Sequence, residues 1–254
     1  GNGAMQRDHW YTISREPTYL EAPKHVGRMA AKRALSRLNA QQLKTGKYPV
    51  LFSPDMASGL IGHLIAGLSG ASIYRKSSFL LDALETKIFP SWMHIYEQPH
   101  IVGAFGSVPF DSEGVQTSSR SIVAEGTLLS YVLDSYSARK LNMKTTGNSG
   151  GVHNLCVEAG KNNFNAMLKE MDKGLFVTEL MGQGVNTVTG DYSRGASGFW
   201  VENGKIQYPV EEITIAGNLK NMFQKIVSVG NDVDLRRNTR TGSILIDEMM
   251  IAGN

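Results

Sequence analysis

The sequence predicts an α+β fold in which mostly antiparallel sheets, joined by hairpins, pack with a few helices. Apolar segments meet at two turn-forming pairs, Glu125-Gly126 and Asn203-Gly204, as expected for neighbouring antiparallel strands. Helical patterns occur between the strands without the regular alternation that a parallel sheet requires. The 254 residues, of which 41% are hydrophobic and 19% charged, suffice for a sizeable core in one large domain or two closely packed lobes.

The first expected helix begins at Pro23. Its basic stripe, formed by Lys24, Arg28 and Lys32 at four-residue spacing, is interpreted as a solvated face. The opposite, apolar face is made of Val26, Met29, Ala30, Ala34 and Leu38.

A strand and a second helix follow. Residues 48–52 are expected to form a short strand. Ser53 is a favourable N-cap and Pro54 suits a first helical turn, so a helix is predicted to about Gly67.

The middle of the chain is expected to alternate short strands and helices. Residues 121–133 form two strands around Glu125-Gly126, and residues 137–141 form a brief helix. Residues 162–171 have a helical period, which Gly174 is expected to close.

The clearest hairpin spans residues 199–209, because Asn203-Gly204 tolerates positive φ at both centres of a type I′ turn. A separate strand, residues 213–216, is followed by Asn218 as the N-cap of a helix. The last strand is residues 243–246. The helix after Asn218 repeats its apolar residues at Leu219, Met222, Phe223 and Ile226.

Composition narrows the classes of function. The chain carries 26 Lys and Arg against 23 Asp and Glu, a net charge of +3, which is far from the dense positive charge of a typical nucleic-acid-binding protein. Its one cysteine, Cys156, excludes an internal disulfide and is interpreted as a buried strand residue. The lack of a second cysteine fits a cytoplasmic protein. The longest apolar run, residues 60–68, is too short to span a bilayer, so we expect no membrane partner.

The run from Leu180 to Trp200 is the most unusual segment, because it contains five glycines among polar and aromatic residues. Glycines at this density indicate tight turns or close approach of another chain to the backbone. The run lacks the order of residues of a phosphate-binding loop or of a dinucleotide-binding turn.

This run, together with Tyr74-Arg75-Lys76-Ser77-Ser78-Phe79-Leu80, Ser135-Tyr136-Ser137-Ala138-Arg139-Lys140-Leu141 and Thr145-Thr146-Gly147-Asn148, resembles the carboxy-terminal region of the TldD/PmbA family. The resemblance is greater to the PmbA (TldE) branch and extends from Met5 to Gly253. It implies a TldD/PmbA-like carboxy-terminal domain over residues 1–254, without the amino-terminal domain of the family. Members of this family have been described as proposed modulators of DNA gyrase.

The resemblance also implies where a zinc site would lie. TldD-type subunits carry a His-Glu-x-x-x-His motif on the helix equivalent to the one predicted from Pro54, with two histidines as ligands and the glutamate as base. When Gly67-Leu68-Ser69-Gly70 is aligned with the residues after that motif, Ile61, Gly62 and Ala66 occupy the positions of the first ligand, the base and the second ligand.

We therefore expect no metal or other cofactor in this chain, and zinc in a TldD-type partner. A metal site assembled from distant side chains is an open alternative. Isolated histidines, however, are more often hydrogen-bonded structural residues than ligands. The side chains available for a distant site are His94, His100, His153 and Cys156.

Local patterns suggest further candidate sites, namely a serine nucleophile loop and two pairs of carboxylates. Gly147-Asn148-Ser149-Gly150-Gly151 resembles the nucleophile loop of trypsin-like proteases, with His94 as a candidate base, but a glycine-rich turn is the favoured interpretation. Glu211 and Glu212 should point to opposite faces of a strand, so they are not expected to converge. Asp232 and Asp234 are interpreted as part of a turn.

The preferred peptide-binding surface consists of Asp191, Tyr192 and Arg194, with Arg75 as a further member. Charged groups bind the ends or side chains of a peptide, a tyrosine stacks, and nearby glycines admit an extended chain. An Asp–Arg pair that only fixes the glycine-rich loop is an equally weighted alternative.

Three functions follow. The leading hypothesis is a metal-free PmbA/TldE-type subunit that joins a zinc-bearing TldD-type subunit in a peptidase acting on unfolded or extended peptides. The alternative is a regulator of DNA gyrase or a nucleic-acid-associated protein, for which Lys24, Arg28 and Lys32 are the only support; nucleic acid is therefore not the expected partner. The third is an independent serine peptidase acting through Ser149.

Overall fold

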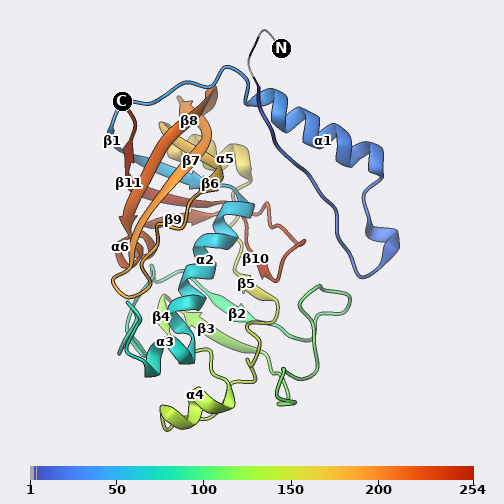
Figure 1. The fold of residues 1–254 in the computed structure, drawn as a ribbon, viewed down its shortest axis with the longest axis vertical. Helices are drawn as coiled ribbons and strands as arrows, with labels where there is room; N and C mark the ends of the chain where they lie inside the picture. Colours follow the sequence, from blue (N-terminus) through green and yellow to red (C-terminus); the bar gives the residue numbers. More distant parts are fainter. Residues whose placement is uncertain (1–2, 4) are drawn as a thin grey trace.

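Two sheets with a helix between them organise the α+β fold of this chain, shown in a computed structural model that describes residues 3 and 5–254 (Figure 1). The helix is α2 (Pro54–Leu68), which contacts strands of both sheets. The other helices are η1 (Pro17–Tyr19), α1 (Pro23–Ser36), α3 (Gly70–Tyr74), α4 (Ser135–Lys140), α5 (Phe164–Met171) and α6 (Leu219–Gln224).

The larger sheet closes on itself. Its six strands run in the order β1-β6-β7-β8-β11-β9, and a further pairing of β1 with β11 joins the first five into a ring. Only β1 and β6 pair in parallel within it. The strands are β1 (Gly46–Phe52), β6 (Gly174–Met181), β7 (Asp191–Glu202), β8 (Lys205–Asn218), β9 (Ile226–Val229) and β11 (Ile244–Ala252).

The smaller sheet lies at the other end of α2, in the order β10-β5-β2-β3-β4. A single hydrophobic cluster includes buried residues of both sheets, such as Val50 and Ile95, together with Leu64 of α2. Within the described residues, no helix has the length and apolar character needed to cross a membrane. The strands of this sheet are β2 (Ile95–Glu97), β3 (Arg120–Ala124), β4 (Thr127–Leu128), β5 (Leu155–Val157) and β10 (Thr239–Arg240).

Local turn chemistry confirms the predicted hairpins. Asn203 and Gly204 have φ of 54° and 64°, so both centres of the β7–β8 turn are left-handed, as a type I′ turn requires. Glu125 and Gly126 have φ of 49° and 74° between β3 and β4. Cys156 is buried on β5, which confirms its interpretation as a core residue.

Several predicted boundaries were wrong. Asp172, with φ of 56°, ends α5, and Gly174 instead begins β6. Residues 213–216 belong to the continuous strand β8, because pairing with β7 extends past them. Ile226 starts β9 rather than extending α6. Ser53 precedes α2 as predicted, but its side chain makes no capping hydrogen bond.

An N-terminal arm, defined as residues 5–40, extends to one side of the ring (Figure 1). It consists of an extended segment, η1 and α1. The helix α1 ends at Ser36, before Leu38, and has no buried residue along its length. The arm is therefore not part of the hydrophobic core, and its attachment must come from other contacts.

Candidate functional site

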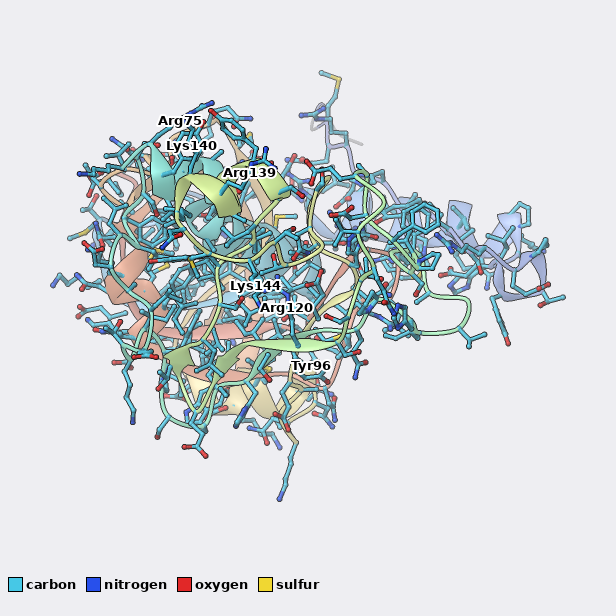
Figure 2. All side chains as sticks on the ribbon, turned by 90° about the horizontal axis from the view of Figure 1, so that it is seen from below. Arg75, Tyr96, Arg120, Arg139, Lys140 and Lys144 are labelled. Atoms are coloured by element: carbon cyan, nitrogen blue, oxygen red, sulfur yellow. The ribbon has the colours of Figure 1, made fainter. Side chains whose placement is uncertain are left out.

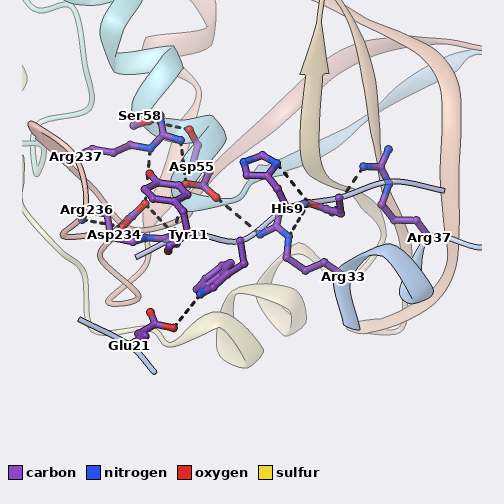
Figure 3. Close-up of polar contacts among 12 residues, drawn as sticks. His9, Tyr11, Glu21, Arg33, Arg37, Asp55, Ser58, Asp234, Arg236 and Arg237 are labelled. Carbon is purple, nitrogen blue, oxygen red and sulfur yellow. Dashed lines mark hydrogen bonds and ion pairs between the residues drawn. The ribbon is translucent and has the colours of Figure 1, made fainter. Parts of the chain in front are cut away.

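A cluster of charged side chains connects the arm to α2 and to the loop before β10 (Figure 3). Arg236 makes a bidentate ion pair with Asp234, with its Nε 2.8 Å from Oδ1 and its Nη2 3.1 Å from Oδ2. Asp55, in the first turn of α2, has its Oδ1 3.6 Å from Arg236 Nη2 and 3.3 Å from Arg237 Nη2. The loop is thus held against the start of α2 by paired charges rather than by apolar packing.

The two carboxyl groups of this cluster are inequivalent. Burial raises the pKa of Asp55, and the adjacent carboxyl of Asp234 raises it further, against the opposing effect of Arg237 and Arg236. Burial also disfavours charge on Asp234, but hydrogen bonds from the side chain and backbone of Arg236 outweigh it and lower the pKa of Asp234. Asp234 is therefore the anchored anion, and Asp55 is the carboxyl that more readily keeps a proton.

The guanidinium groups of two arginines contact the arm and hold it in place. Arg236 donates from Nη1 to the carbonyl of Tyr11 at 3.2 Å and lies over the rings of Trp10 and Tyr11, at 4.1 and 4.7 Å from their centroids. Arg37, the one buried residue of the arm, donates to the carbonyl of Arg7 and pairs with Glu179 of β6. These contacts hold the extended segment by its backbone and its aromatic rings.

Between the arm and the ring lies a cavity of about 660 Å³. Three half-buried phenylalanines from α5, β6 and β7 line it, with ring centroids 4.8 Å apart for Phe164 and Phe176 and 6.2 Å apart for Phe176 and Phe199. Charged residues of α1, α2 and the loop before β10 line its other sides. We call it the aromatic cavity.

Two of the predicted peptide-binding residues, Asp191 and Arg194, make separate local contacts. Asp191 accepts hydrogen bonds from Thr189 and Asn218, and no ion pair joins it to Arg194 within the described part of the chain. Arg194 donates to the carbonyl of Met181. The alternative of an Asp–Arg pair is therefore wrong, and the two side chains make separate contacts at the loop after β6.

Tyr192 is a core residue. Its side chain is 2% exposed and packs edge-to-face on His63 of α2, with centroids 6.0 Å apart. Burial raises the pKa of Tyr192 to about 12. The pKa of His63 is lowered, mainly by burial and to a smaller extent by the positive charge of Arg194. The expectation that Tyr192 stacks on a peptide is wrong, because the β7 pleat turns its ring towards α2.

Arg75 lies near Arg139 and Lys140, a grouping that the sequence did not predict (Figure 2). It stacks over Tyr74 at 5.4 Å, Lys140 lies over Tyr136 at 5.6 Å, and the two tyrosine rings are 5.7 Å apart. None of the cations here forms an ion pair with another described residue. We define this α3–α4 surface by Tyr74, Arg75, Lys76, Tyr136, Arg139 and Lys140.

The loop containing Ser149 is structural in its contacts. The Ser149 backbone N–H donates to Asp111 Oδ2 at 2.9 Å, and Asn148 is held by Glu97 and Arg120. Among the described residues, no histidine is hydrogen-bonded to the Ser149 hydroxyl, so the geometry lacks the base that a serine nucleophile needs. The glycine-rich turn is the interpretation that these contacts favour.

Glu211 and Glu212 line the same hollow, contrary to the prediction that strand alternation would separate them. The register with β7 shifts between Ala196 and Gly198, and Glu212 takes a φ of 55°, so a bulge interrupts the alternation of β8. Both carboxylates line a hollow of about 430 Å³, together with Glu179 and Arg37. They accept hydrogen bonds from Gln6 and Gln42, which again attach the N-terminal part of the chain.

Comparison with known proteins identifies the family. The profile of the PmbA/TldA metallopeptidase C-terminal domain matches residues 45–253. The chain belongs to the PmbA/TldD family. It is 56% identical to the protein named Metalloprotease PmbA of Escherichia coli O157:H7 over 252 residues, which is 99% of this chain and 56% of that protein. The family predicted from the sequence is thereby confirmed.

Solved structures of similar proteins have the same fold. A crystal structure from Bacteroides thetaiotaomicron, described as a proposed modulator of DNA gyrase, matches with a TM-score of 0.91 and 34% identity over 96% of this chain and 55% of that one. TldE from Thermococcus kodakarensis matches in fold with a TM-score of 0.80, 24% identity, and coverage of 91% and 55%. The chain therefore spans little more than half the length of its relatives.

The PmbA/TldD resemblance places the zinc motif on α2, and the residues there do not fit a zinc ion. The Ile61 side chain is fully buried in the core, Gly62 has no side chain, and Ala66 presents an exposed methyl group. Over residue 3 and residues 5–254, no three His, Cys, Asp or Glu side chains gather in a way that could hold a metal ion. His100 bonds Thr117 and His153 bonds the Gly147 carbonyl, while His94 lies next to β2.

Sequence reasoning missed Asp55, Arg236 and Arg237. The residue types were visible, since Pro54-Asp55 begins a helix and an Arg-Arg pair follows Asp234 in a polar loop. Their pairing was not visible, because α2 and the loop before β10 are brought together only by the fold. The aromatic cavity was missed for the same reason.

Proposed function

We propose that this chain is a metal-free subunit of a cytoplasmic PmbA/TldD metallopeptidase, which helps to bind unfolded or extended peptides while a TldD-type partner supplies zinc. One observation carries this proposal. At the three α2 positions where the resemblance places two ligands and a base, the chain has an isoleucine, a glycine and an alanine. A peptide-binding role is supported by the aromatic cavity and by the way Arg37 and Arg236 hold backbone carbonyls of an extended segment.

The test is reconstitution with a TldD-type protein. We expect the two proteins to copurify, zinc to be found by mass spectrometry in the partner alone, and cleavage of an unfolded protein substrate to require both. A mixture in which the partner's motif glutamate is replaced by glutamine is the control, and it should be inactive. Stoichiometric zinc in this chain, together with peptide hydrolysis by it alone, would falsify the proposal.

A second candidate function is binding of a single-stranded nucleic acid, and the α3–α4 surface favours it. On this surface, cations lie over the exposed ring of Tyr136 and the half-buried ring of Tyr74. Bases stack on aromatic rings and phosphates pair with cations on surfaces of this kind. The stripe of Lys24, Arg28 and Lys32, which the sequence singled out, lies on α1 without such a pair of aromatic rings.

Anisotropy of a labelled oligothymidine would test this second function. We expect binding at low salt that weakens at physiological salt and is lost in the double variant Arg139→Glu, Lys140→Glu. The matched control, Lys24→Glu, Arg28→Glu, reverses the same number of charges on α1 and should bind normally. Equal loss in both variants, or no binding at low salt, would contradict it.

A further inference from the structure

The aromatic cavity has two walls of different character. Phe176 and Phe199 lie on paired strands of the ring, and Phe164 lies on α5. Phe164 and Phe176 pack against a buried cluster of six residues, so this wall is fixed by the core. Three half-buried rings that face a cavity leave apolar surface that another apolar group can cover.

The opposite wall is charged. The cavity is lined by four cations, Lys32, Arg33, Arg37 and Arg236, and by four carboxylates, Asp8, Asp55, Asp232 and Asp234. Arg33 and Arg37 pair with Asp8, and Arg236 pairs with Asp234. The Asp232 carboxylate accepts hydrogen bonds from the backbone and hydroxyl of Ser243.

Lys32 is the exception among these cations. It is exposed, lines the cavity from α1 together with Met29, and forms no ion pair with any described residue. The carboxylates around it are already engaged by arginines or by Ser243. Among the described residues, Lys32 is thus the one cation of the lining without an ion pair, and Asp232 is the one such carboxylate; Lys32 is the group available to a ligand's anion beside the aromatic wall.

We propose that the aromatic cavity binds the carboxy-terminal residue of a peptide that ends in a large apolar side chain. The side chain would lie on the rings of Phe164, Phe176 and Phe199, and the terminal carboxylate would pair with Lys32. A cavity of about 660 Å³ falls in the size range of small-ligand sites, which is about 300 to 1,000 Å³. The inference rests on the proposed function only in taking a peptide as the ligand.

The test measures binding to the isolated chain, without partner, zinc or hydrolysis. The probes are the tripeptides Ala-Ala-Phe, its carboxamide Ala-Ala-Phe-NH₂, and Ala-Ala-Ala. Titration calorimetry gives the affinity. Trp10, which lines the cavity, gives an independent fluorescence signal that should be lost in Trp10→Phe.

We expect Ala-Ala-Phe to bind at least about tenfold more tightly than Ala-Ala-Ala, because only the phenyl ring covers the aromatic wall. The carboxamide should bind about threefold more weakly than the acid, as expected for one exposed ion pair. Lys32→Gln should abolish that difference, whereas Lys24→Gln, a charge change on the same helix outside the cavity, should preserve it.

Phe199→Ala should weaken binding of Ala-Ala-Phe, and Phe110→Ala, which truncates an exposed ring outside the cavity, should not. Because Phe199 lies in the ring, the unfolding temperature of each variant is measured, and Phe164→Ala on α5 serves as a second variant.

Absence of saturable binding, or binding unchanged by Phe199→Ala and Phe164→Ala, would overturn the proposal. Equal affinity for acid and carboxamide would overturn the role of Lys32. Failure of zinc-dependent cleavage with a partner would leave these affinities unchanged, so the two proposals fail separately.

Discussion

Helices α1 and α2 are similar in length, but they are attached to the molecule in opposite ways. Of the 15 residues of α2, seven are buried, and they pack between the two sheets. Of the 14 residues of α1, none is buried. The arm that contains α1 is held instead by ion pairs, by hydrogen bonds to its backbone, and by guanidinium groups stacked on Trp10 and Tyr11.

Because of this difference, the two walls of the aromatic cavity differ in stability. Its phenylalanine wall is as stable as the ring, because separating it would expose buried apolar surface. Its charged wall is stabilised by contacts that are individually weak and sensitive to pH and salt. The arm can therefore shift locally without unfolding of the core, and the following substitutions test that contrast.

The largest effect is expected at the core helix. Leu64→Ala removes a fully buried side chain from the cluster shared by both sheets, and should lower the free energy of unfolding by about 2–5 kcal/mol. Leu35→Ala truncates a leucine of α1 that is 66% exposed, and should change stability by about 0.5 kcal/mol or less. Urea unfolding followed by circular dichroism gives both values. A large loss at Leu35 would show that α1 is part of the cooperative core.

The second-largest loss of stability is expected from a substitution of Asp234. Asp234→Asn removes the anion that pairs with Arg236 and leaves a poorly exposed guanidinium without its main partner, so we expect a loss of about 1–3 kcal/mol. Because the pKa of Asp234 is lowered, its stabilisation is present above the unfolded pKa and is lost as pH falls through the folded pKa. The variant should therefore differ most from the wild type at neutral pH, and the stability difference should shrink in acid.

Arg236→Gln should act mainly on the arm. The change removes the stacking on Trp10 and Tyr11 and the hydrogen bond to the Tyr11 carbonyl, while the ring and α2 keep their core contacts. We expect faster hydrogen exchange over residues 8–12 with little change over β7 and β8. Arg28→Gln, on the exposed side of α1, is the matched control. Equal acceleration in the ring strands would mean that the arm and the ring open together.

The smallest change in stability is expected from a substitution of Asp55. Because the pKa of Asp55 is raised, its protonated form is favoured by the fold, and its contribution to stability is fully present below the unfolded pKa and lost as pH rises through the folded pKa. Asn resembles the protonated carboxyl, so Asp55→Asn should leave stability at neutral pH unchanged or slightly higher. Relative to the wild type, the variant should become more stable from acid to neutral pH. A loss as large as that of Asp234→Asn would contradict this assignment.

Local chemistry explains what could be predicted from the sequence. The β7–β8 turn needs positive φ at two neighbouring residues, and Asn203-Gly204 supplies this regardless of the rest of the fold. Pro54 sets the start of α2 in the same way. Ile226 fitted the helical period after Asn218, but pairing with β11 places it on β9 instead, because tertiary hydrogen bonding outweighed a weak local preference.

By itself, the sequence determined the α+β class, the hairpins, the family, and the absence of donor side chains at positions 61, 62 and 66, since these depend on residue type and short spacing. Only the tertiary structure decided that Tyr192 is buried, that Glu211 and Glu212 share a hollow, and that Asp55 meets Asp234. Strand register, a bulge and long-range packing set the direction of those side chains. The aromatic cavity belongs to the second group, because its lining comes from the arm, α2, α5, the strands β6 and β7, and the loop before β10, which are far apart in the sequence.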